Sequence, residues 1–355
     1  MNKLDNLKSI KKLDRSDMLK FISGLPEQCL DAYGAGMSSD ITKPPVKINN
    51  IVFAGMGGSG IGAELVKSCL ERELSVPMSI CRSYALPGFV KDDTLLFCSS
   101  YSGNTEETLS CFEEGVRKKA FIVTLGTGGK LKELSSANKC VHIPVPPGYP
   151  PRTAVGYMSI ILLGVLAALG FVEDKKKDVD ELYSALSGIR DKEAGFDVPA
   201  RENIAKQIAA KLYKKYPVLY GTAGSTEAVS ARWRGQIAEN SKALSSSGVL
   251  PEMDHNEIVG WRFPEKLLKD FKVIMLCDKG DDERVRERAR ITVNVIKKSK
   301  AEVITLERNG SSRLARLFSL MYIGDFTSFY LAILNGIDPT PVDSIDYLKK
   351  ELGKI

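Results

Sequence analysis

The chain has 355 residues, which is enough to bury a large core and typical of two domains. Its 50 Lys and Arg residues against 44 Asp and Glu give a net charge of +6, spread along the chain without a basic block. This distribution suits an anionic metabolite and gives little support to nucleic-acid binding, which needs clustered basic residues with aromatics. The N-terminus lacks the apolar core of a signal peptide, since charges recur from Lys3 through Arg15.

The seven cysteines are scattered, lie mostly within apolar segments and form no Cys-x-x-Cys pair. We therefore expect buried thiols in a reducing compartment, and hence a cytoplasmic protein without a metal site or a cofactor.

An uncharged segment, residues 154–172, is near the lower length limit for crossing a bilayer. It contains three glycines and has no equally apolar companion in the chain. We therefore predict a helix buried in the core or in a subunit interface, and no membrane association.

The first part of the chain alternates apolar strands with helical patterns, after one or two amphipathic helices in residues 1–45, of which 16–33 is the clearer. Strands are expected near 49–54, 76–81, 93–98, 120–125 and 140–145, and helices near 59–72, 104–118 and 129–137. Apolar strands separated by helices predict a parallel sheet covered on both faces. A proline-rich segment, 144–152, and the uncharged helix then close a first domain, residues 1–172.

A charged helical crossover, residues 173–213, leads to a second strand and helix pattern in residues 214–355. Strands are expected near 217–221, 249–252, 272–277 and 301–306, and helices near 225–242, 281–299, 313–335 and 342–352. The first of these strands ends in a glycine followed by serine and threonine, which is similar to the strand–glycine–serine turn of the first domain. We therefore predict an α/β protein of two doubly wound, flavodoxin-like parallel-sheet domains, with the ligand in the cleft between them.

Two glycine- and hydroxyl-rich turns are the most informative feature of the chain. The sequence GMGGSG at 55–60 follows a strand-like segment, and so does SSYSGNTEET at 99–108. A strand–turn–helix junction presents free backbone N–H groups at the positive end of a helix dipole, which binds anions. Glycines allow close approach and hydroxyls add donors. Two such turns at one sheet edge predict a phosphorylated small molecule as the ligand.

The glycine turn alone also fits a simple tight turn or, loosely, a dinucleotide-binding fingerprint. The chain has no P-loop sequence GxxxxGK[ST], and the strand 76–81 ends in Arg82 and Ser83 where a dinucleotide-binding fold needs an acidic residue. The density of serine and threonine in the second turn also exceeds what pyrophosphate binding requires. The pair of turns therefore favours a phosphorylated metabolite over a nucleotide.

Four residues have side chains that could take part in catalysis or in binding an anion. His255 lies in a polar loop after a strand, where titrating groups commonly function, although a solvated loop histidine is the alternative. His142 lies within a strand and is expected to be a core or edge histidine. Glu239 lies on a helix and by itself predicts a surface residue. Arg152 follows two prolines that restrict its backbone, which suits a fixed cation beside a phosphate site, against the alternative of a surface arginine.

These motifs resemble those of a known family. The sequence GGSG at 57–60 with SYSGNT at 100–105 resembles the sugar isomerase (SIS) domain. Further matches are LPEQ at 25–28, PRTA at 151–154, ENSK at 239–242, LPE at 250–252, HN at 255–256 and IDYLK at 345–349. This ordered set spans nearly the whole chain and is similar to the bifunctional phosphoglucose/phosphomannose isomerases.

The resemblance implies an enzyme that interconverts glucose 6-phosphate and mannose 6-phosphate with fructose 6-phosphate through a cis-enediolate, without a metal. It implies that the phosphate is held by Gly58, Ser59, Ser100, Ser102 and Thr105. Glu239 would move the proton between C1 and C2, and Arg152 would stabilise the enediolate. His255, reaching the site from the other subunit of a homodimer, would help to open the hexose ring, and Lys349 would assist at the ring oxygen.

This chemistry is reasonable on physical grounds. Aldose–ketose conversion removes a weakly acidic C–H proton, so the base must be in contact and the enediolate needs a fixed cation. An enediol is planar at C2, so protonation on either face gives the glucose or the mannose configuration at one site.

The chain departs from the pattern of some relatives at two positions. Val342 stands where some relatives have a threonine, for which Thr340 is the nearest substitute, and Asp254 stands where some have a second histidine. Both departures bear on the balance between the two sugars. The alternatives are a monofunctional phosphoglucose isomerase, an amino-sugar-phosphate isomerase, or a non-catalytic protein that senses sugar phosphates. The sequence shows no helix-turn-helix pattern or basic patch that would support such a regulator.

Overall fold

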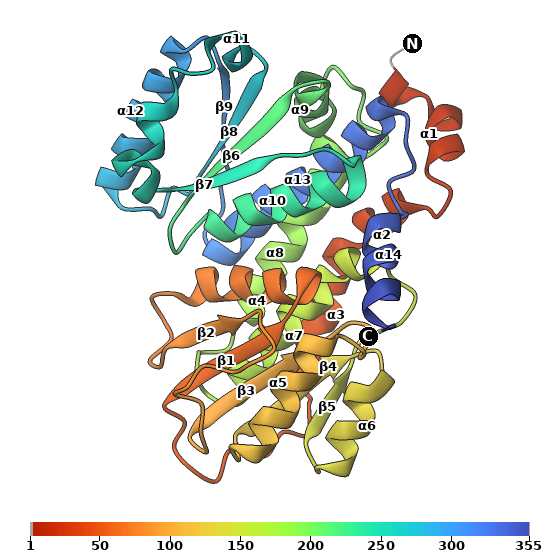
Figure 1. Cartoon of the computed structure of the whole chain (residues 1–355), viewed down its shortest axis with the longest axis vertical. Coiled ribbons are helices and arrows are strands. Elements are labelled where there is room, and N and C mark those ends of the chain that lie inside the picture. Colours follow the sequence, from red (N-terminus) through yellow and green to blue (C-terminus); the bar gives the residue numbers. More distant parts are fainter. Residues whose placement is uncertain (1–2, 355) are drawn as a thin grey trace.

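The computed structural model describes residues 3–354 and contains two parallel β-sheets with helices packed around and between them (Figure 1). The first sheet has the order β2-β1-β3-β4-β5, with β1 (Asn50–Gly55), β2 (Met78–Cys81), β3 (Thr94–Ser99), β4 (Phe121–Gly126) and β5 (Val141–Pro144). The second has the order β7-β6-β8-β9, with β6 (Tyr216–Thr222), β7 (Ser246–Leu250), β8 (Phe271–Cys277) and β9 (Glu302–Glu307). The predicted α/β class with two parallel sheets is confirmed.

Both sheets are wound in the same way. The first strand of each lies between the second and the third, so the direction of winding reverses between β1 and β3 and again between β6 and β8. Strand β3 is buried along its whole length because helices cover both faces of the sheet, which explains its uninterrupted apolar sequence. In open sheets of this kind a ligand binds beyond the carboxyl ends of the strands at the reversal point.

Fourteen α-helices connect and cover the strands in the described residues. Those before the second sheet are α1 (Leu7–Leu13), α2 (Met18–Ser23), α3 (Leu25–Met37), α4 (Gly57–Leu70), α5 (Glu106–Arg117), α6 (Gly129–Ala137), α7 (Val155–Ala168), α8 (Lys176–Ile189) and α9 (Ile204–Leu212). The remaining helices are α10 (Glu227–Ser241), α11 (Glu265–Leu268), α12 (Glu283–Lys298), α13 (Arg313–Asn335) and α14 (Asp343–Leu352).

The expectation of a single helix over 16–33 is wrong. The segment forms α2 and α3, separated at Gly24, because Pro26 lacks a backbone N–H and occupies the first turn of a new helix. Helix α11 and the short 3₁₀ turns Glu252–His255 and Glu257–Gly260 are also absent from the sequence prediction.

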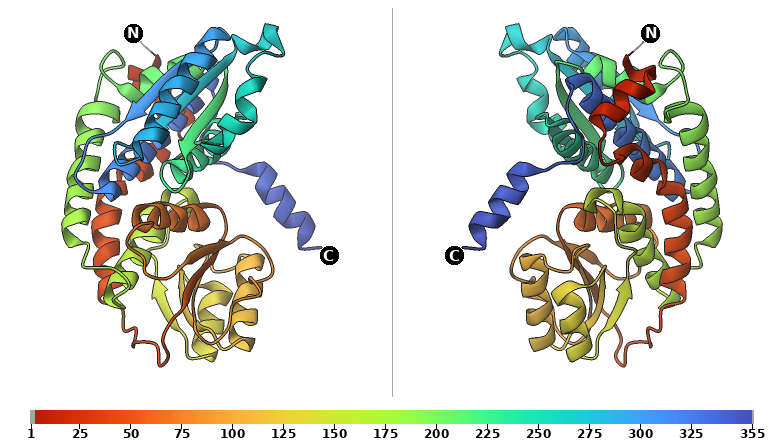
Figure 2. Two further views of the ribbon diagram at one scale, coloured as in Figure 1. Left: turned by 90° about the vertical axis from the view of Figure 1, so that its left-hand side faces the viewer. Right: turned by 90° about the vertical axis from the view of Figure 1, so that its right-hand side faces the viewer.

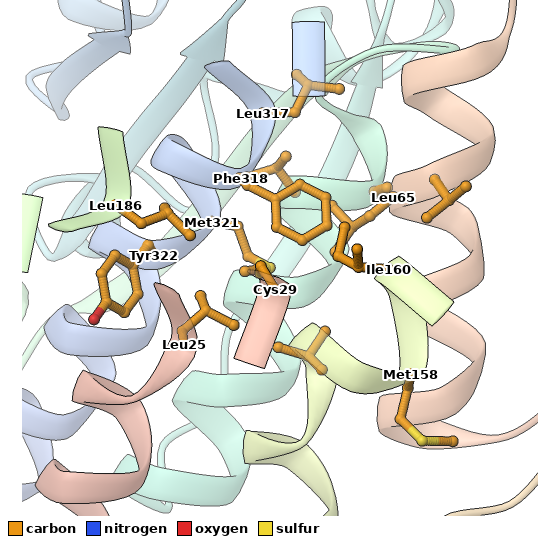
Figure 3. Close-up of a cluster of buried hydrophobic side chains, with 14 of the residues drawn as sticks. Leu25, Cys29, Leu65, Met158, Ile160, Leu186, Leu317, Phe318, Met321 and Tyr322 are labelled. Carbon is orange, nitrogen blue, oxygen red and sulfur yellow. The ribbon is translucent and has the colours of Figure 1, made fainter. Parts of the chain in front are cut away.

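The main hydrophobic core lies between the two sheets and is built by helices from both halves of the chain. Figure 3 shows part of it, where side chains of α3, α4, α7, α8 and α13 converge: Leu25, Cys29, Leu65, Met158, Ile160, Leu186, Leu317, Phe318, Met321 and Tyr322. The same cluster includes Phe53 of β1 and Leu219 of β6. One continuous core therefore holds the helices between the sheets in a fixed position relative to both sheets. The domain boundaries predicted from the sequence, at residues 172 and 213, stay a prediction.

The uncharged segment forms α7, whose residues Val155 to Leu166 are all buried within this one chain. The prediction of a core helix is confirmed. Because α7 is buried within its own chain, it is not evidence for a subunit interface. Helix α13 is long and apolar enough to cross a membrane, but 94% of its most apolar window is buried inside the protein. That burial identifies α13 as a second core helix.

The charged segment 173–213 is packed more closely than a simple crossover requires. Helix α8 buries one face against α3 and α13, through Val179, Leu182, Leu186 and Ile189. Helix α9 also packs against α13. Most charged residues of α8 and α9 therefore lie on the opposite, solvent-exposed faces of amphipathic helices. Lys206 of α9 is an exception, because it is buried and pairs with Asp5 at 2.9 Å.

The last helix, α14, extends away from the rest of the chain (Figure 2). None of its residues is buried, and even the apolar side chains of Tyr347 and Leu348 are 67% and 57% exposed. An amphipathic helix with an exposed apolar face ordinarily packs against another surface. Within the described residues of this chain, α14 buries no side chain on such a surface.

Candidate active site

The two glycine- and hydroxyl-rich turns lie side by side at the carboxyl edge of the first sheet. Strands β1 and β3 are neighbours, and their register pairs Gly55 with Ser99. In the second turn Ser100 Oγ lies 2.8 Å from Thr105 Oγ1 and accepts a hydrogen bond from the Gly103 N–H at 3.0 Å. These bonds fix the turn at the start of α5, where the dipole of the helix favours an anion.

Ser102 is placed differently from Ser100. It is exposed, and its Oγ accepts a weak bond from the Asn104 N–H at 3.3 Å. Its neighbour Gly103 has φ +71°, and a Cβ there would lie only 1.8 Å from the Gly128 carbonyl oxygen. A glycine is therefore required at this position to keep Ser102 at the tip of the turn.

The amino end of α4 lies directly against the segment that contains Arg152. Gly57 has φ +50°, and a Cβ on Gly58 would lie 2.9 Å from the Pro151 carbonyl oxygen. Ser59 is buried in the first turn of the same helix. The glycines thus allow the helix terminus to approach the 3₁₀ turn Pro151–Thr153.

Arg152 is buried and is held by groups that come from the second half of the chain. Its Nε donates to Asn240 Oδ1 at 2.7 Å, and its Nη2 donates to the carbonyl oxygens of Pro339 and Thr340, both at 2.8 Å. Its Nη1 lies 3.7 Å from Glu239 Oε2, an ion-pair contact that is too long for a hydrogen bond. Nη1 is therefore the part of the guanidinium left to donate to a ligand.

A pocket of about 240 Å³ opens between the amino end of α4 and one face of α10. The first sheet's side of it is lined by Gly57, Gly58, Ile61 and Arg82. Helix α10 contributes Ala231, Arg232, Arg234, Gly235, Gln236 and Glu239. The structure therefore brings the predicted Gly58, Arg152 and Glu239 together at the junction of the two halves of the chain.

Sequence reasoning missed Arg82, Arg232 and Gln236 as residues of this pocket. Arg232 is buried, pairs with Asp325 at 3.0 Å and donates to the Arg152 carbonyl oxygen at 2.6 Å. Arg232, Gln236 and Glu239 are spaced by four and three residues, so they share one helix face. That spacing upstream of Glu239 is the sequence signal that would have indicated Arg232 and Gln236.

Lys242 also lies beside Arg152, and its pKa responds to the charge of Arg152. Lys242 Nζ donates to the carbonyl oxygens of Glu239 and Pro339, at 2.7 and 2.9 Å. Burial lowers the pKa of Lys242, and the neighbouring charge of Arg152 lowers it further. Burial also lowers the pKa of Arg152, while the carboxylate of Glu239 raises it in part. Arg152 and Lys242 thus place two cations near Glu239, while Asp338 is a further carboxylate that acts on both cations.

Thr340 lies beside this cluster as well. Its carbonyl oxygen accepts from Arg152, and its Oγ1 is buried without a hydrogen-bond partner among the described residues. Val342, two residues further on, precedes α14.

His255 and Lys349 do not line the pocket with Glu239 in this single chain. His255 is exposed on a 3₁₀ turn after β7, and its neighbour Asp254 accepts from Thr292 of α12 at 2.7 Å. Lys349 is exposed on α14. His142 lies on the edge strand β5 beside Thr124 Oγ1, at 2.9 Å, which agrees with a core or edge histidine.

Pocket size alone would point elsewhere. A larger cavity of about 540 Å³, lined largely by apolar and aromatic residues that include Trp261, Phe263 and Phe271, lies beside the second sheet. It contains none of the predicted site residues, so we place the candidate site in the smaller pocket, which the first glycine turn and Glu239 line. The predicted Ser59, Ser100, Ser102 and Thr105 are not part of that lining.

Comparisons with known proteins identify the family to which the chain is similar. The family model "Bacterial phospho-glucose isomerase C-terminal SIS domain" matches residues 201–352. A bifunctional phosphoglucose/phosphomannose isomerase of Caldicellulosiruptor bescii is 41% identical over 95% of this chain and 99% of its own. Another relative of the same name, from Aquifex aeolicus, is 39% identical over 89% of this chain and 94% of its own.

A solved structure supports the fold. The glucose-6-phosphate isomerase-like protein of Thermus thermophilus superimposes with a TM-score of 0.64 at 19% identity, covering 99% of both chains. At this identity the likeness concerns the fold alone. From the two relatives, which match nearly the full chain, it follows that the protein belongs to the family of bifunctional phosphoglucose/phosphomannose isomerases and is an isomerase.

Proposed function

We propose that the protein interconverts glucose 6-phosphate and mannose 6-phosphate with fructose 6-phosphate through a cis-enediolate. The observation that supports this most directly is that the α4 amino end and Glu239 line one pocket, and that Arg152 lies beside it with its Nη1 3.7 Å from Glu239 Oε2. A carboxylate, a fixed cation and an anion-binding helix end are the groups that the isomerisation of a sugar phosphate requires.

In the proposed reaction the phosphate is held by backbone N–H groups and hydroxyls of Gly58, Ser59, Ser100, Ser102 and Thr105. Glu239 takes the C2 proton of the open-chain aldose, and the electron pair moves to form the C1–C2 double bond while charge develops on the C1 oxygen. Arg152 Nη1 stabilises that charge, so the reaction draws on no metal. The hydroxyl proton on the C2 oxygen passes to the C1 oxygen, and return of the carbon-bound proton from Glu239 to C1 leaves the carbonyl at C2, which gives the ketose.

Protonation of the same enediolate at C2, from either face, gives glucose 6-phosphate or mannose 6-phosphate. Val342 stands where some relatives have a threonine, but Thr340 next to Arg152 still supplies a hydroxyl near the site. That hydroxyl has no hydrogen-bond partner among the described residues. We propose that Thr340 affects the balance between the two products.

We also propose a homodimer in which His255 and Lys349 act at the sugar ring, with His255 reaching the site of the partner. Both residues are exposed and lie outside the pocket of their own chain. The segments around them have exposed apolar side chains, Val259 and Phe263 after His255 and Tyr347 and Leu348 beside Lys349. Such patches mark interaction surfaces.

The test is incubation of the purified protein with fructose 6-phosphate, followed by separate detection of glucose 6-phosphate and mannose 6-phosphate. Formation of both supports the bifunctional reaction, whereas glucose 6-phosphate alone would indicate a monofunctional enzyme. A parallel incubation with glucosamine 6-phosphate tests an amino-sugar activity. Binding of these ligands without any turnover would indicate a sensor instead.

A further inference from the structure

Gln236 is a buried polar residue of the pocket to which the proposed reaction assigns no role. Its side chain is 1% exposed and forms part of the pocket lining beside Glu239. Its Nε2 has no hydrogen-bond partner among the residues that the structure describes. Buried amide groups are nearly always paired in proteins, so this donor calls for a partner that the chain itself does not supply.

The position of Gln236 on α10 is firmly fixed. Its neighbour Trp233 is fully buried and donates from Nε1 to the Leu320 carbonyl oxygen at 2.9 Å, and Ile237 is also fully buried. Gln236 precedes Glu239 by three residues, so the two side chains lie on the same face of the helix. The amide is thus held next to the carboxylate that would move the proton.

Arg232 and Glu239, the two charged residues of α10 that share this face with Gln236, already have partners. Arg232 binds Asp325 through Nε and Nη2, and Glu239 forms an ion pair with Arg152. The amide of Gln236 is neutral, so it can donate to an oxygen without competing with Glu239 for the proton or neutralising it.

A buried unpartnered amide is not by itself a sign of a ligand, as Gln28 shows. Gln28 is 2% exposed and both its amide atoms lack partners among the described residues, yet it lies between α3 and Gly156 of α7 and lines none of the pockets described above. Gln236 differs because its unpartnered donor belongs to the lining of a pocket that also contains Glu239.

We propose that Gln236 is a substrate-binding residue that donates from Nε2 to the oxygen on C1 or C2 of the open-chain sugar. These two oxygens are bonded to C1 and C2, the carbons between which Glu239 moves the proton. Negative charge develops on the oxygens in the enediolate. This inference rests on the proposed isomerase function. A hydrogen bond to an oxygen that gains charge is strongest in the transition state, so it accelerates the reaction.

The test compares Gln236→Met, which keeps the length of the side chain but removes both donors, with the matched control Gln28→Met. For Gln236→Met we expect kcat/KM with fructose 6-phosphate to fall about ten- to a hundredfold, the usual loss for a hydrogen bond to a charged group. Competitive inhibition by inorganic phosphate should stay unchanged, because phosphate binds at the turns after β1 and β3. Gln28→Met should retain the kcat and KM of the parent protein.

A second measurement separates this inference from the proposed function. Calorimetric titration with fructose 6-phosphate should show weaker binding by Gln236→Met, even if the parent protein binds the sugar without converting it. Parental kcat, KM and affinity in a folded Gln236→Met protein would overturn the role of Gln236 and leave the isomerase function intact. An unchanged kcat/KM together with weaker inhibition by inorganic phosphate would place the amide at the phosphate instead, and would equally overturn it.

Discussion

Arg152 and Glu239 meet across the junction between the two sheets, with Nη1 of one 3.7 Å from Oε2 of the other. Arg152 is 4% exposed and donates three hydrogen bonds to acceptors from the second half of the chain. The Glu239 side chain, in contrast, is 33% exposed and lines the pocket. A rigid cation therefore stands beside a carboxylate that a ligand can reach. That pairing suits a reaction in which a base removes a proton and the remaining charge needs stabilisation.

Glu239→Gln is expected to abolish conversion of both sugars together, because one base serves both. Loss of a general base typically lowers the rate by about two to four powers of ten. Exchange of the C1 or C2 hydrogen with deuterated water, followed by NMR, measures proton removal directly and should be lost as well. His255→Ala should slow turnover of the cyclic sugar but spare this exchange for substrate that is already open.

Glu227→Gln, at the far end of α10, is the matched control and should leave turnover and exchange unchanged. If exchange continued in a folded Glu239→Gln protein, another residue would have to be the base.

Ser102→Ala is expected to raise the KM for sugar phosphates about ten- to a hundredfold, because one hydrogen bond to the phosphate is lost. Ser102 is a sharper probe than Ser100, since Ser100 also holds the turn through Thr105 and Gly103. Steady-state kinetics of alanine variants at Ser59, Ser100, Ser102 and Thr105 measure the effect. The exposed Ser136 of α6 serves as the control position. A KM that stays constant for two of the four variants would move the phosphate site elsewhere.

A mixture of the inactive Glu239→Gln protein and the slowed His255→Ala protein is expected to gain activity towards the cyclic sugar when the subunits exchange. In a shared site, one of the two sites of a mixed dimer would combine an intact Glu239 with an intact His255. Activity after mixing is followed against time, and exchange itself is followed by mass spectrometry of differently labelled subunits. Mixed dimers that form but remain inactive would disprove the sharing of the site.

The pH dependence of stability is expected to include a contribution from His142. Burial lowers the pKa of His142 from its ordinary value of 6.5, so the folded protein binds fewer protons at this residue than the unfolded chain does. As the pH falls below 6.5, protonation favours the unfolded chain and the free energy of unfolding decreases. Denaturant unfolding of the parent and of His142→Gln should therefore show a smaller decrease on acidification for the variant. An equal decrease in both proteins would contradict this.

Much of this protein follows from local sequence patterns. The apolar strands separated by helical segments predict both parallel sheets, and the glycine turns after β1 and β3 predict an anion-binding edge. The two sheets and the position of the turns are as predicted, because strand burial, turn conformation and helix start depend on residues close together in the chain. The binding of an anion at that edge stays a prediction. The errors are local too, as where Pro26 divides an apparently continuous helix.

The composition of the pocket could not be obtained in this way. On the sequence alone Glu239 is a helical carboxylate like many others, and Gln236 has no distinguishing feature. Only the packing of α10 on α4 and α13 brings Glu239 to Arg152 and turns Gln236 into the pocket lining. The sequence therefore determined the two sheets and the glycine- and hydroxyl-rich turns, through interactions between near neighbours. The tertiary structure decided which distant charges and unpaired donors face one another, because burial in a shared core sets their partners.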